Sequence, residues 1–200
     1  MSLTNTIRPQ ILVFAGPNGS GKSTITKRIP ICGTYVNADE IKRVSQCTDL
    51  EAAQEAELIR NMLLEAKKDF TFETVLSTDR NLKLLRKAKE RGYEIQVVFV
   101  LTSNPCINVS RVKARVKAGG HDVPEEKIIS RYGRSLRNLS KIVRIADCTR
   151  VIDNSGNEPH LICEILNQLV TIWETEHWNK KAILKLLSDY NPCERENQRL

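Results

Sequence analysis

The chain has few aromatic residues, no closely spaced cysteines and only three histidines. Four Phe, four Tyr and two Trp in 200 residues provide little material for stacking the bases of a nucleic acid. The six cysteines, at positions 32, 47, 106, 148, 163 and 193, form no C-x-x-C pair, and the histidines are scattered. The usual patterns of a zinc site are therefore absent. We expect free thiols and no structural metal.

Long apolar runs are also lacking. The longest, Val97–Leu101, is far too short to span a bilayer. The segment Met1–Gln10 does not have the basic-then-apolar pattern of a signal peptide. A content of 40% hydrophobic and 28% charged residues is typical of a globular protein of one domain. We expect a cytoplasmic protein with no membrane contact, folded as a single domain over residues 1–200.

Positive charge exceeds negative charge, with 31 Lys and Arg against 24 Asp and Glu and a net charge of +7. Such a balance suits polyanionic partners. The arginines fall at helical spacing and are not interleaved with aromatic residues. Nucleotide phosphates therefore explain the charge more economically than nucleic acid, and we expect no nucleic-acid partner.

The most informative motif is the octapeptide Gly16–Ser23, which fits the phosphate-loop (Walker A) pattern G-x-x-x-x-G-K-[ST] and directly follows the apolar stretch Ile11–Ala15. Its glycines let backbone N–H groups point at a phosphate, where the next helix adds its positive dipole end. Lys22 should reach the β- and γ-phosphates, and the Ser23 hydroxyl should ligate Mg²⁺. The residues assigned to ATP binding here are Gly16, Pro17, Asn18, Gly19, Ser20, Gly21, Lys22, Ser23 and Thr24.

Apolar stretches of strand length alternate with amphipathic helical patterns along the chain. The predicted strands are Ile11–Ala15, Tyr35–Val36, Phe70–Phe72, Ile95–Leu101 and Arg150–Ile152. This alternation predicts an α/β protein with a three-layer P-loop NTPase or kinase fold, a five-stranded parallel sheet and a helical lid. The carboxyl ends of the strands should share one edge, where ligands bind in open sheets. Residues of about 158–190 are predicted to form two C-terminal helices.

Acidic residues follow two of these strands. Asp39, after the strand at Tyr35–Val36, is our candidate for the base that accepts the proton of an acceptor hydroxyl. Asp39 could instead cap the following helix, and Glu40 is a nearby competitor for the catalytic role. Glu73 reaches the same edge and could hold Mg²⁺ through water or bind the acceptor. We also assign Asn37 and Thr74 to acceptor binding.

Two arginine-bearing helices joined by Gly119 and Gly120 look like a lid over the phosphates, spanning about 105–137. Closing such a lid excludes water, while its arginines neutralise charge in the transition state. The candidate arginines are Arg111, Arg115, Arg131 and Arg134, and each could also be a surface residue. Asn154, in the loop after the last predicted strand, is a candidate contact to the adenine ring, although Asp153, Asn154 and Ser155 could equally form a turn before the final helix.

Seven short motifs occur in order between about residues 10 and 156. They lie at 16–23, 37–41, 72–77, 111–116, 119–125, 131–139 and 153–155. Together they resemble those of the zeta-toxin-like P-loop kinases, in the bacterial branch often labelled predicted ABC-type ATPases. The chain has no LSGGQ-like ABC signature and no N-K-x-D motif for guanine, which argues against an ABC ATPase and a GTPase.

The resemblance implies a kinase that uses ATP and Mg²⁺, and zeta toxins phosphorylate a hydroxyl of UDP-N-acetylglucosamine. It implies that Asp39 is the catalytic aspartate and Glu73 a substrate-site acid. It further implies that Arg115 and Arg131 contact the phosphates of ATP. If the chain is a toxin, an antitoxin protein that covers the ATP site is the expected partner.

One residue departs from the family pattern. Val75 stands where family toxins carry threonine, so a hydrogen bond to a UDP-sugar is either missing or supplied by Thr74. Other relatives phosphorylate chloramphenicol, NAD or nucleosides, and the fold alone selects no acceptor. Our first interpretation is a kinase that acts on a hydroxyl of a small molecule. A polynucleotide or nucleoside 5′-kinase and an ATP-hydrolysing switch are the alternatives.

Overall fold

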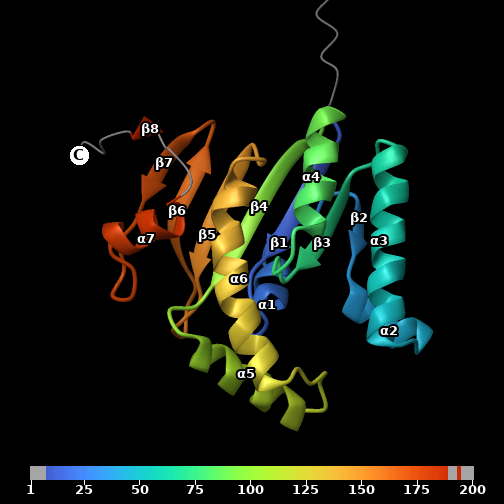
Figure 1. Cartoon of the computed structure of the whole chain (residues 1–200), viewed down its shortest axis with the longest axis horizontal. Coiled ribbons are helices and arrows are strands. Elements are labelled where there is room, and N and C mark those ends of the chain that lie inside the picture. Colours follow the sequence, from blue (N-terminus) through green and yellow to red (C-terminus); the bar gives the residue numbers. More distant parts are fainter. Residues whose placement is uncertain (1–7, 189–192, 195–200) are drawn as a thin grey trace, which may run out of the picture.

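The centre of the molecule is an eight-stranded sheet with the order β2-β3-β1-β4-β5-β6-β7-β8 (Figure 1). The structure is a computed structural model, and it describes residues 8–188 and 193–194. The strands β2, β3, β1, β4 and β5 are parallel, which confirms the predicted five-stranded parallel sheet. The strands are β1 (Gln10–Ala15), β2 (Thr34–Val36), β3 (Phe70–Thr74), β4 (Glu94–Leu101), β5 (Cys148–Asp153), β6 (His160–Leu166), β7 (Leu169–Ile172) and β8 (Cys193–Glu194).

Helices cover both faces of the sheet, as a three-layer α/β fold requires. The main hydrophobic core packs α3, α4, α6 and α7 on one face, and a smaller cluster around Ile25 of α1 covers the other. Figure 1 shows α3, α4 and α6 side by side in front of the strands. The helices are α1 (Lys22–Thr26), α2 (Ala38–Ser45), α3 (Asp49–Glu65), α4 (Arg80–Glu90), α5 (Pro105–Lys117), α6 (Glu125–Val143) and α7 (Lys180–Leu186).

The prediction of two C-terminal helices at about 158–190 is wrong over its first part. Up to residue 188, where the description of this segment ends, it forms the antiparallel strands β6 and β7 and one helix, α7. The turn between the strands holds Asn167 and Gln168 at φ values of 50° and 68°, the left-handed conformation that two-residue hairpin turns require. Leu161, Ile165 and Leu169 also repeat at helical spacing. The sequence pattern alone therefore fits both structures.

The predicted lid region contains α5 and α6, joined by residues 118–124. These two helices enclose their own hydrophobic cluster, formed by Val109, Val112, Val123 and Ile128. Tyr132 of α6 donates a hydrogen bond to the Thr102 carbonyl at the end of β4, at 2.5 Å. The lid segment is thus a small packing unit fastened beside the carboxyl end of the sheet. No helix among the described residues is both long and apolar enough to cross a membrane.

Candidate active site

The phosphate loop turns sharply between β1 and α1, as its glycines predict. Gly16, Gly19 and Gly21 have φ values of 139°, 75° and 91°, where side chains other than glycine are strained. A Cβ atom on Gly16 would lie 2.0 Å from the carbonyl oxygen of Val100, and one on Gly21 would lie 2.2 Å from the Asn154 amide nitrogen. The backbone can therefore curl here only with glycine.

Lys22 lies at the centre of the charged groups of the site. Its ammonium group donates hydrogen bonds to the carbonyl oxygens of Gly16 and Pro17 at 2.8 and 3.0 Å. Burial lowers the pKa of Lys22 to about 8, while Glu73 and Asp39 act to raise it and Arg115 to lower it. The structure therefore brings four of the residues singled out in the sequence into one electrostatic neighbourhood.

Glu73 accepts hydrogen bonds from three hydroxyl groups, two on α1 and one on β2. Its carboxylate accepts hydrogen bonds from Ser23 at 3.1 Å, Thr26 at 2.9 Å and Tyr35 at 2.7 Å. Burial and Glu73 together raise the pKa of Tyr35, which keeps its hydroxyl protonated as a donor. The contact with Ser23 places Glu73 beside the phosphate loop. Thr74, the next residue, also lines the cleft.

Asn37 and Asp39, at the start of α2, have different roles: Asn37 caps the helix and Asp39 lines the cleft. The side chain of Asn37 caps the helix by accepting a hydrogen bond from the Asp39 backbone N–H at 2.9 Å. Asp39 is therefore not the capping residue. Its carboxylate makes no hydrogen bond or ion pair with the residues that the structure describes, and it lines the cleft. Glu40 does not line the cleft, which leaves Asp39 as the better-placed acid.

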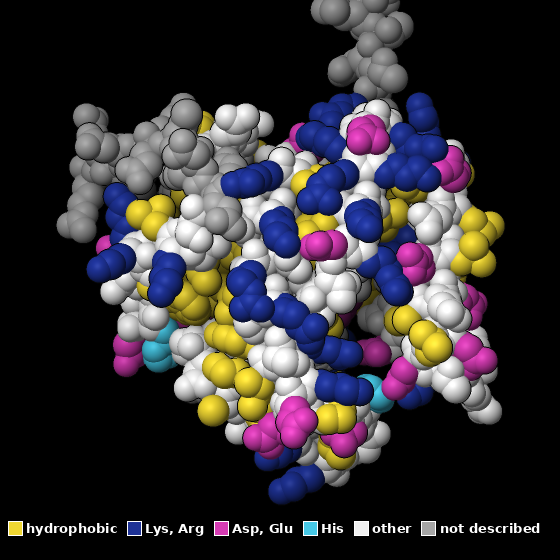
Figure 2. All heavy atoms as spheres, viewed as in Figure 1, with side chains coloured by type: hydrophobic (Ala, Val, Ile, Leu, Met, Phe, Trp, Pro, Cys, Tyr) yellow, Lys and Arg dark blue, Asp and Glu magenta, His cyan; other side chains and the backbone are white. Residues whose placement is uncertain are grey.

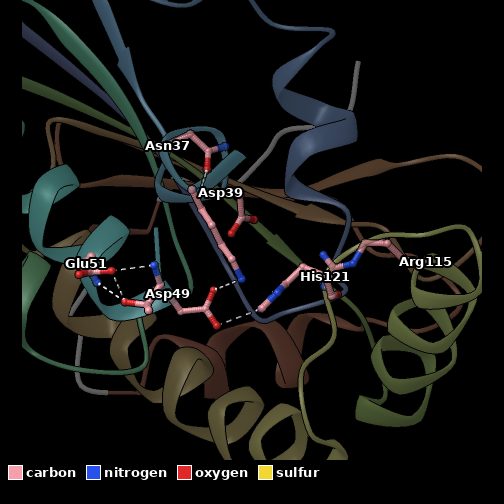
Figure 3. A network of polar contacts seen from close by, with 8 residues as sticks. Asn37, Asp39, Asp49, Glu51, Arg115 and His121 are labelled. Carbon is pink, nitrogen blue, oxygen red and sulfur yellow. Dashed lines mark hydrogen bonds and ion pairs between the residues drawn. The ribbon is translucent and has the colours of Figure 1, made fainter. Parts of the chain in front are cut away.

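A chain of polar contacts joins the lid loop to the helices opposite. Arg115 donates a hydrogen bond to the His121 carbonyl at 2.8 Å, and the His121 ring lies 3.7 Å from the Asp49 carboxylate. Asp49 also pairs with Lys42 at 2.6 Å. Figure 3 shows Asp39 near this network, with no dashed line to its carboxylate. The network bridges the cleft between the lid and α3.

Arg111 and Asn154 support the phosphate loop from the lid side. The Asn154 side chain donates a hydrogen bond to the Ser20 carbonyl at 2.8 Å, and Arg111 donates to the Asn154 carbonyl at 2.7 Å. Asn108 of α5 similarly donates to the Asn18 carbonyl at 2.6 Å. Asn154 therefore acts on the loop itself, whereas Arg111 acts through Asn154 and also lines the cleft.

A cleft of about 730 Å³ is lined by Lys22, Asp39, Glu73 and Arg115 together. Its walls include Thr24 beside the phosphate loop and Arg131 of the lid. Arg134 lies elsewhere: its guanidinium hydrogen-bonds to Ser130 of its own helix, and it lines a separate hollow next to α7. We correct the sequence assignment accordingly and leave Arg134 out of the proposed site.

Sequence reasoning missed several residues in or next to the cleft, among them two that contact Glu73. Thr26 lies one helical turn after Ser23, and Tyr35 belongs to a predicted strand. These positions in the sequence could have identified both residues. Arg60 and Arg80 line the cleft from α3 and α4, at positions that carry no motif. Lys and Arg side chains also gather outside the cleft, over α4 and α6 (Figure 2), where they include Arg86, Lys89, Lys141 and Arg144.

The fold defines the class of the protein as a P-loop NTPase or kinase, because a glycine-rich phosphate loop joins the first strand to a helix at the carboxyl edge of a parallel sheet. The zeta toxin family model matches residues 29–162, more than half of the chain. The chain therefore belongs to the zeta toxin family. An uncharacterized protein of Haemophilus influenzae is 28% identical over 127 residues, which are 60% of this chain and 91% of that protein.

Solved structures share the fold at low sequence identity. A chain of the AvrRxo1-ORF1:-ORF2 complex with ATP has a TM-score of 0.70 and 16% identity, over 94% of this chain and 66% of that chain. This chain thus spans just under two thirds of that one. A chain of the PezAT toxin-antitoxin system of Streptococcus pneumoniae has a TM-score of 0.53 and 17% identity, over 77% and 72% of the two chains.

Proposed function

We propose that the protein is a kinase that transfers the γ-phosphoryl group of ATP to a hydroxyl group of a small molecule. One observation carries the proposal. Lys22 of the phosphate loop, Asp39 with its unpaired carboxylate and the lid residue Arg115 line the same cleft, and Asp39 and Arg115 both act on the charge of Lys22. A donor phosphate and an acceptor hydroxyl could therefore meet within reach of a base.

In the proposed reaction the hydroxyl oxygen attacks the γ-phosphorus and the bond to the β,γ-bridging oxygen breaks. ADP leaves with the electron pair of that bond, and the hydroxyl proton passes to Asp39. Lys22 holds the β- and γ-phosphates, and Arg115 and Arg131 neutralise the charge that spreads over the transferred group. The lid of α5 and α6 keeps water from competing with the alcohol.

The residues beside the phosphate loop fit Mg²⁺. Among the described residues, no cluster of three or more His, Cys, Asp or Glu could hold a metal by itself. The Ser23 hydroxyl lies 3.1 Å from Glu73, and a hydroxyl beside a carboxylate is a suitable oxygen donor set once phosphate oxygens complete it. Bound Mg²⁺ would neutralise phosphate charge. We assign Ser23 as its direct ligand and Glu73 as a ligand through water.

The acceptor and the partner follow from the family and remain proposals. A UDP-sugar is the first acceptor to test, because zeta toxins use one, and Val75 is the position at which specificity would differ. We propose an antitoxin as the protein partner, since one of the structural neighbours is a toxin-antitoxin system. We place the reaction in the cytoplasm, where ATP is available.

The test is a search for new phosphomonoesters by mass spectrometry. The protein is incubated with ATP, Mg²⁺ and a panel of sugar nucleotides, nucleosides, NAD, small alcohols and oligonucleotides, beside the Lys22→Met variant as a control. We expect a product with one added phosphate that the control does not form. Fast ATP hydrolysis without any phosphorylated acceptor would contradict the proposal and favour a switch, and products on oligonucleotide ends alone would favour a polynucleotide kinase.

A further inference from the structure

Arg60 lies on the buried face of α3, where the other buried side chains are apolar. The buried residues of α3 are Ala52, Ala56, Arg60 and Leu64, at intervals of four. Arg60 is only 7% exposed. A buried charge is costly unless it is paired, so the position calls for an anion close to the guanidinium.

The described part of the chain does not supply that anion. Arg60 makes no hydrogen bond or ion pair with any described residue, and its Nε atom is buried without a partner. Its guanidinium carbon lies 5.1 Å from the centre of the Phe72 ring. An aromatic face stabilises a cation but leaves the in-plane N–H donors unsatisfied.

The neighbouring carboxylate is already engaged. Glu57 pairs with Arg80 at 3.1 Å, so two arginines share one acid. Burial lowers the pKa of Arg60, Glu57 opposes this effect and Arg80 adds to it. Because a guanidinium stays protonated and the described residues leave it without a pairing partner, an external anion would balance the charge.

Arg60 also lines the cleft that contains Asp39 and Glu73. It lies on the wall formed by α3, where the small side chains of Ala52, Ala53 and Ala56 leave space. The phosphates of ATP belong to a different wall, formed by the phosphate loop. A group bound at Arg60 would therefore be part of the molecule whose hydroxyl reaches Asp39.

We propose that Arg60 binds an anionic group of the acceptor, a phosphate or a carboxylate, and thereby selects anionic alcohols over neutral ones. This inference rests on the proposed kinase function. A guanidinium pairs with either group through two parallel N–H donors. A neutral alcohol would leave the buried guanidinium unpaired, and sites built to pair a polar group discriminate strongly against analogues that lack it.

A binding experiment tests the inference without turnover. The phosphate loop is saturated with Mg²⁺ and a non-hydrolysable ATP analogue, and inorganic phosphate or acetate is titrated while the Nε–H signal of Arg60 is followed by NMR. We expect a saturable shift, and the anion that causes it identifies the group. Calorimetry should show phosphate or acetate binding weakened about tenfold or more in Arg60→Met and unchanged in Arg86→Met, an exposed arginine of α4. No shift with either anion, or equal affinity in Arg60→Met, overturns the inference.

A kinetic experiment separates the inference from the proposed function. Each neutral alcohol of the acceptor panel is paired with its phosphate ester and its carboxylate analogue. We expect transfer to an anionic member, with KM raised about tenfold or more in Arg60→Met and an intermediate KM in Arg60→Lys. If neutral alcohols are phosphorylated efficiently, and at the same rate in wild type and Arg60→Met, the proposed role of Arg60 is refuted. The kinase proposal itself would still hold. If Arg60→Met does not fold, Arg60→Lys and the wild-type NMR titration decide.

Discussion

Asn37 and Asp39 lie two residues apart, and their side chains have different roles in the site. Asn37 satisfies the open backbone N–H at the start of α2, which leaves the Asp39 carboxylate available for chemistry. Glu73 does the opposite, because it gathers the hydroxyls of Ser23, Thr26 and Tyr35. One acid is thus held rigidly beside the proposed metal position, and the other is left to accept a proton.

The titration of Lys22 gives a prediction on ATP binding. Burial lowers its pKa to about 8, so the ligand-free side chain is charged below this pH and becomes neutral above it. A bound triphosphate favours the charged form and raises the pKa again. We therefore expect ATP binding at about pH 9 to take up a proton, and ATP affinity to fall as the pH rises above 8.

Calorimetry in two buffers of different ionisation enthalpy measures this proton uptake. The matched control is Lys22→Arg, whose guanidinium stays charged throughout and should take up no proton. Equal proton uptake in the two proteins would show that another group titrates and that Lys22 is not perturbed in this way.

Glu73→Gln tests the proposed metal side of the site. The substitution keeps the size of the side chain but removes the charge that would attract Mg²⁺ through water. We expect the Mg²⁺ concentration for half-maximal phosphoryl transfer to rise by about tenfold, with a smaller increase for Tyr35→Phe, which removes one of the hydrogen bonds to Glu73. An unchanged Mg²⁺ requirement in Glu73→Gln would refute its assignment to the metal.

At the scale of elements, an exposed polar contact joins the lid to α3. His121 of the lid loop lies 3.7 Å from Asp49 at the first turn of α3, whereas the interior of the lid is held by the separate cluster around Val112. Exposed ion pairs stabilise by under about 1 kcal/mol. The contact between the lid loop and α3 can therefore form and break at little cost in free energy.

Asp49→Asn should loosen this contact. We expect amide hydrogen exchange at residues 118–124 to become about two- to fivefold faster, in line with the loss of an exposed pair. Asp122→Asn, which removes a charge from the same loop without a contact to α3, is the control and should change exchange much less. Identical exchange in wild type and Asp49→Asn would mean that Asp49 does not restrain the lid.

At the scale of the whole molecule, the parallel half of the fold could be predicted because each strand is a short apolar stretch followed by a turn. All five predicted strands form, and their carboxyl ends bring the phosphate loop, Asp39 and Glu73 to one edge. The hairpin of β6 and β7 could not be predicted, since its apolar spacing also suits a helix. Its turn depends on positive φ values at Asn167 and Gln168, which neither residue type demands.

The site was predictable where chemistry follows from local sequence and unpredictable where it depends on packing. The phosphate loop is identified by its motif. Asp39 and Glu73 are identified by their positions at the ends of predicted strands. Arg60 could not be identified in this way, because the argument for its role is that it is buried without a counterion. That property is visible only in the folded structure. Arg134 shows the converse, since its helical spacing suggested the cleft but its guanidinium folds back onto Ser130.

The central claim is that Asp39 accepts the proton of an acceptor hydroxyl. Its most direct test is the rate of phosphoryl transfer in a single turnover, once the acceptor panel has supplied a substrate. Asp39→Asn should slow the transfer by about 10²-fold or more while leaving ATP affinity unchanged. Glu40→Gln, on the same helix but outside the cleft, should stay within a factor of about two of wild type. Transfer by Asp39→Asn at the wild-type rate would contradict the account.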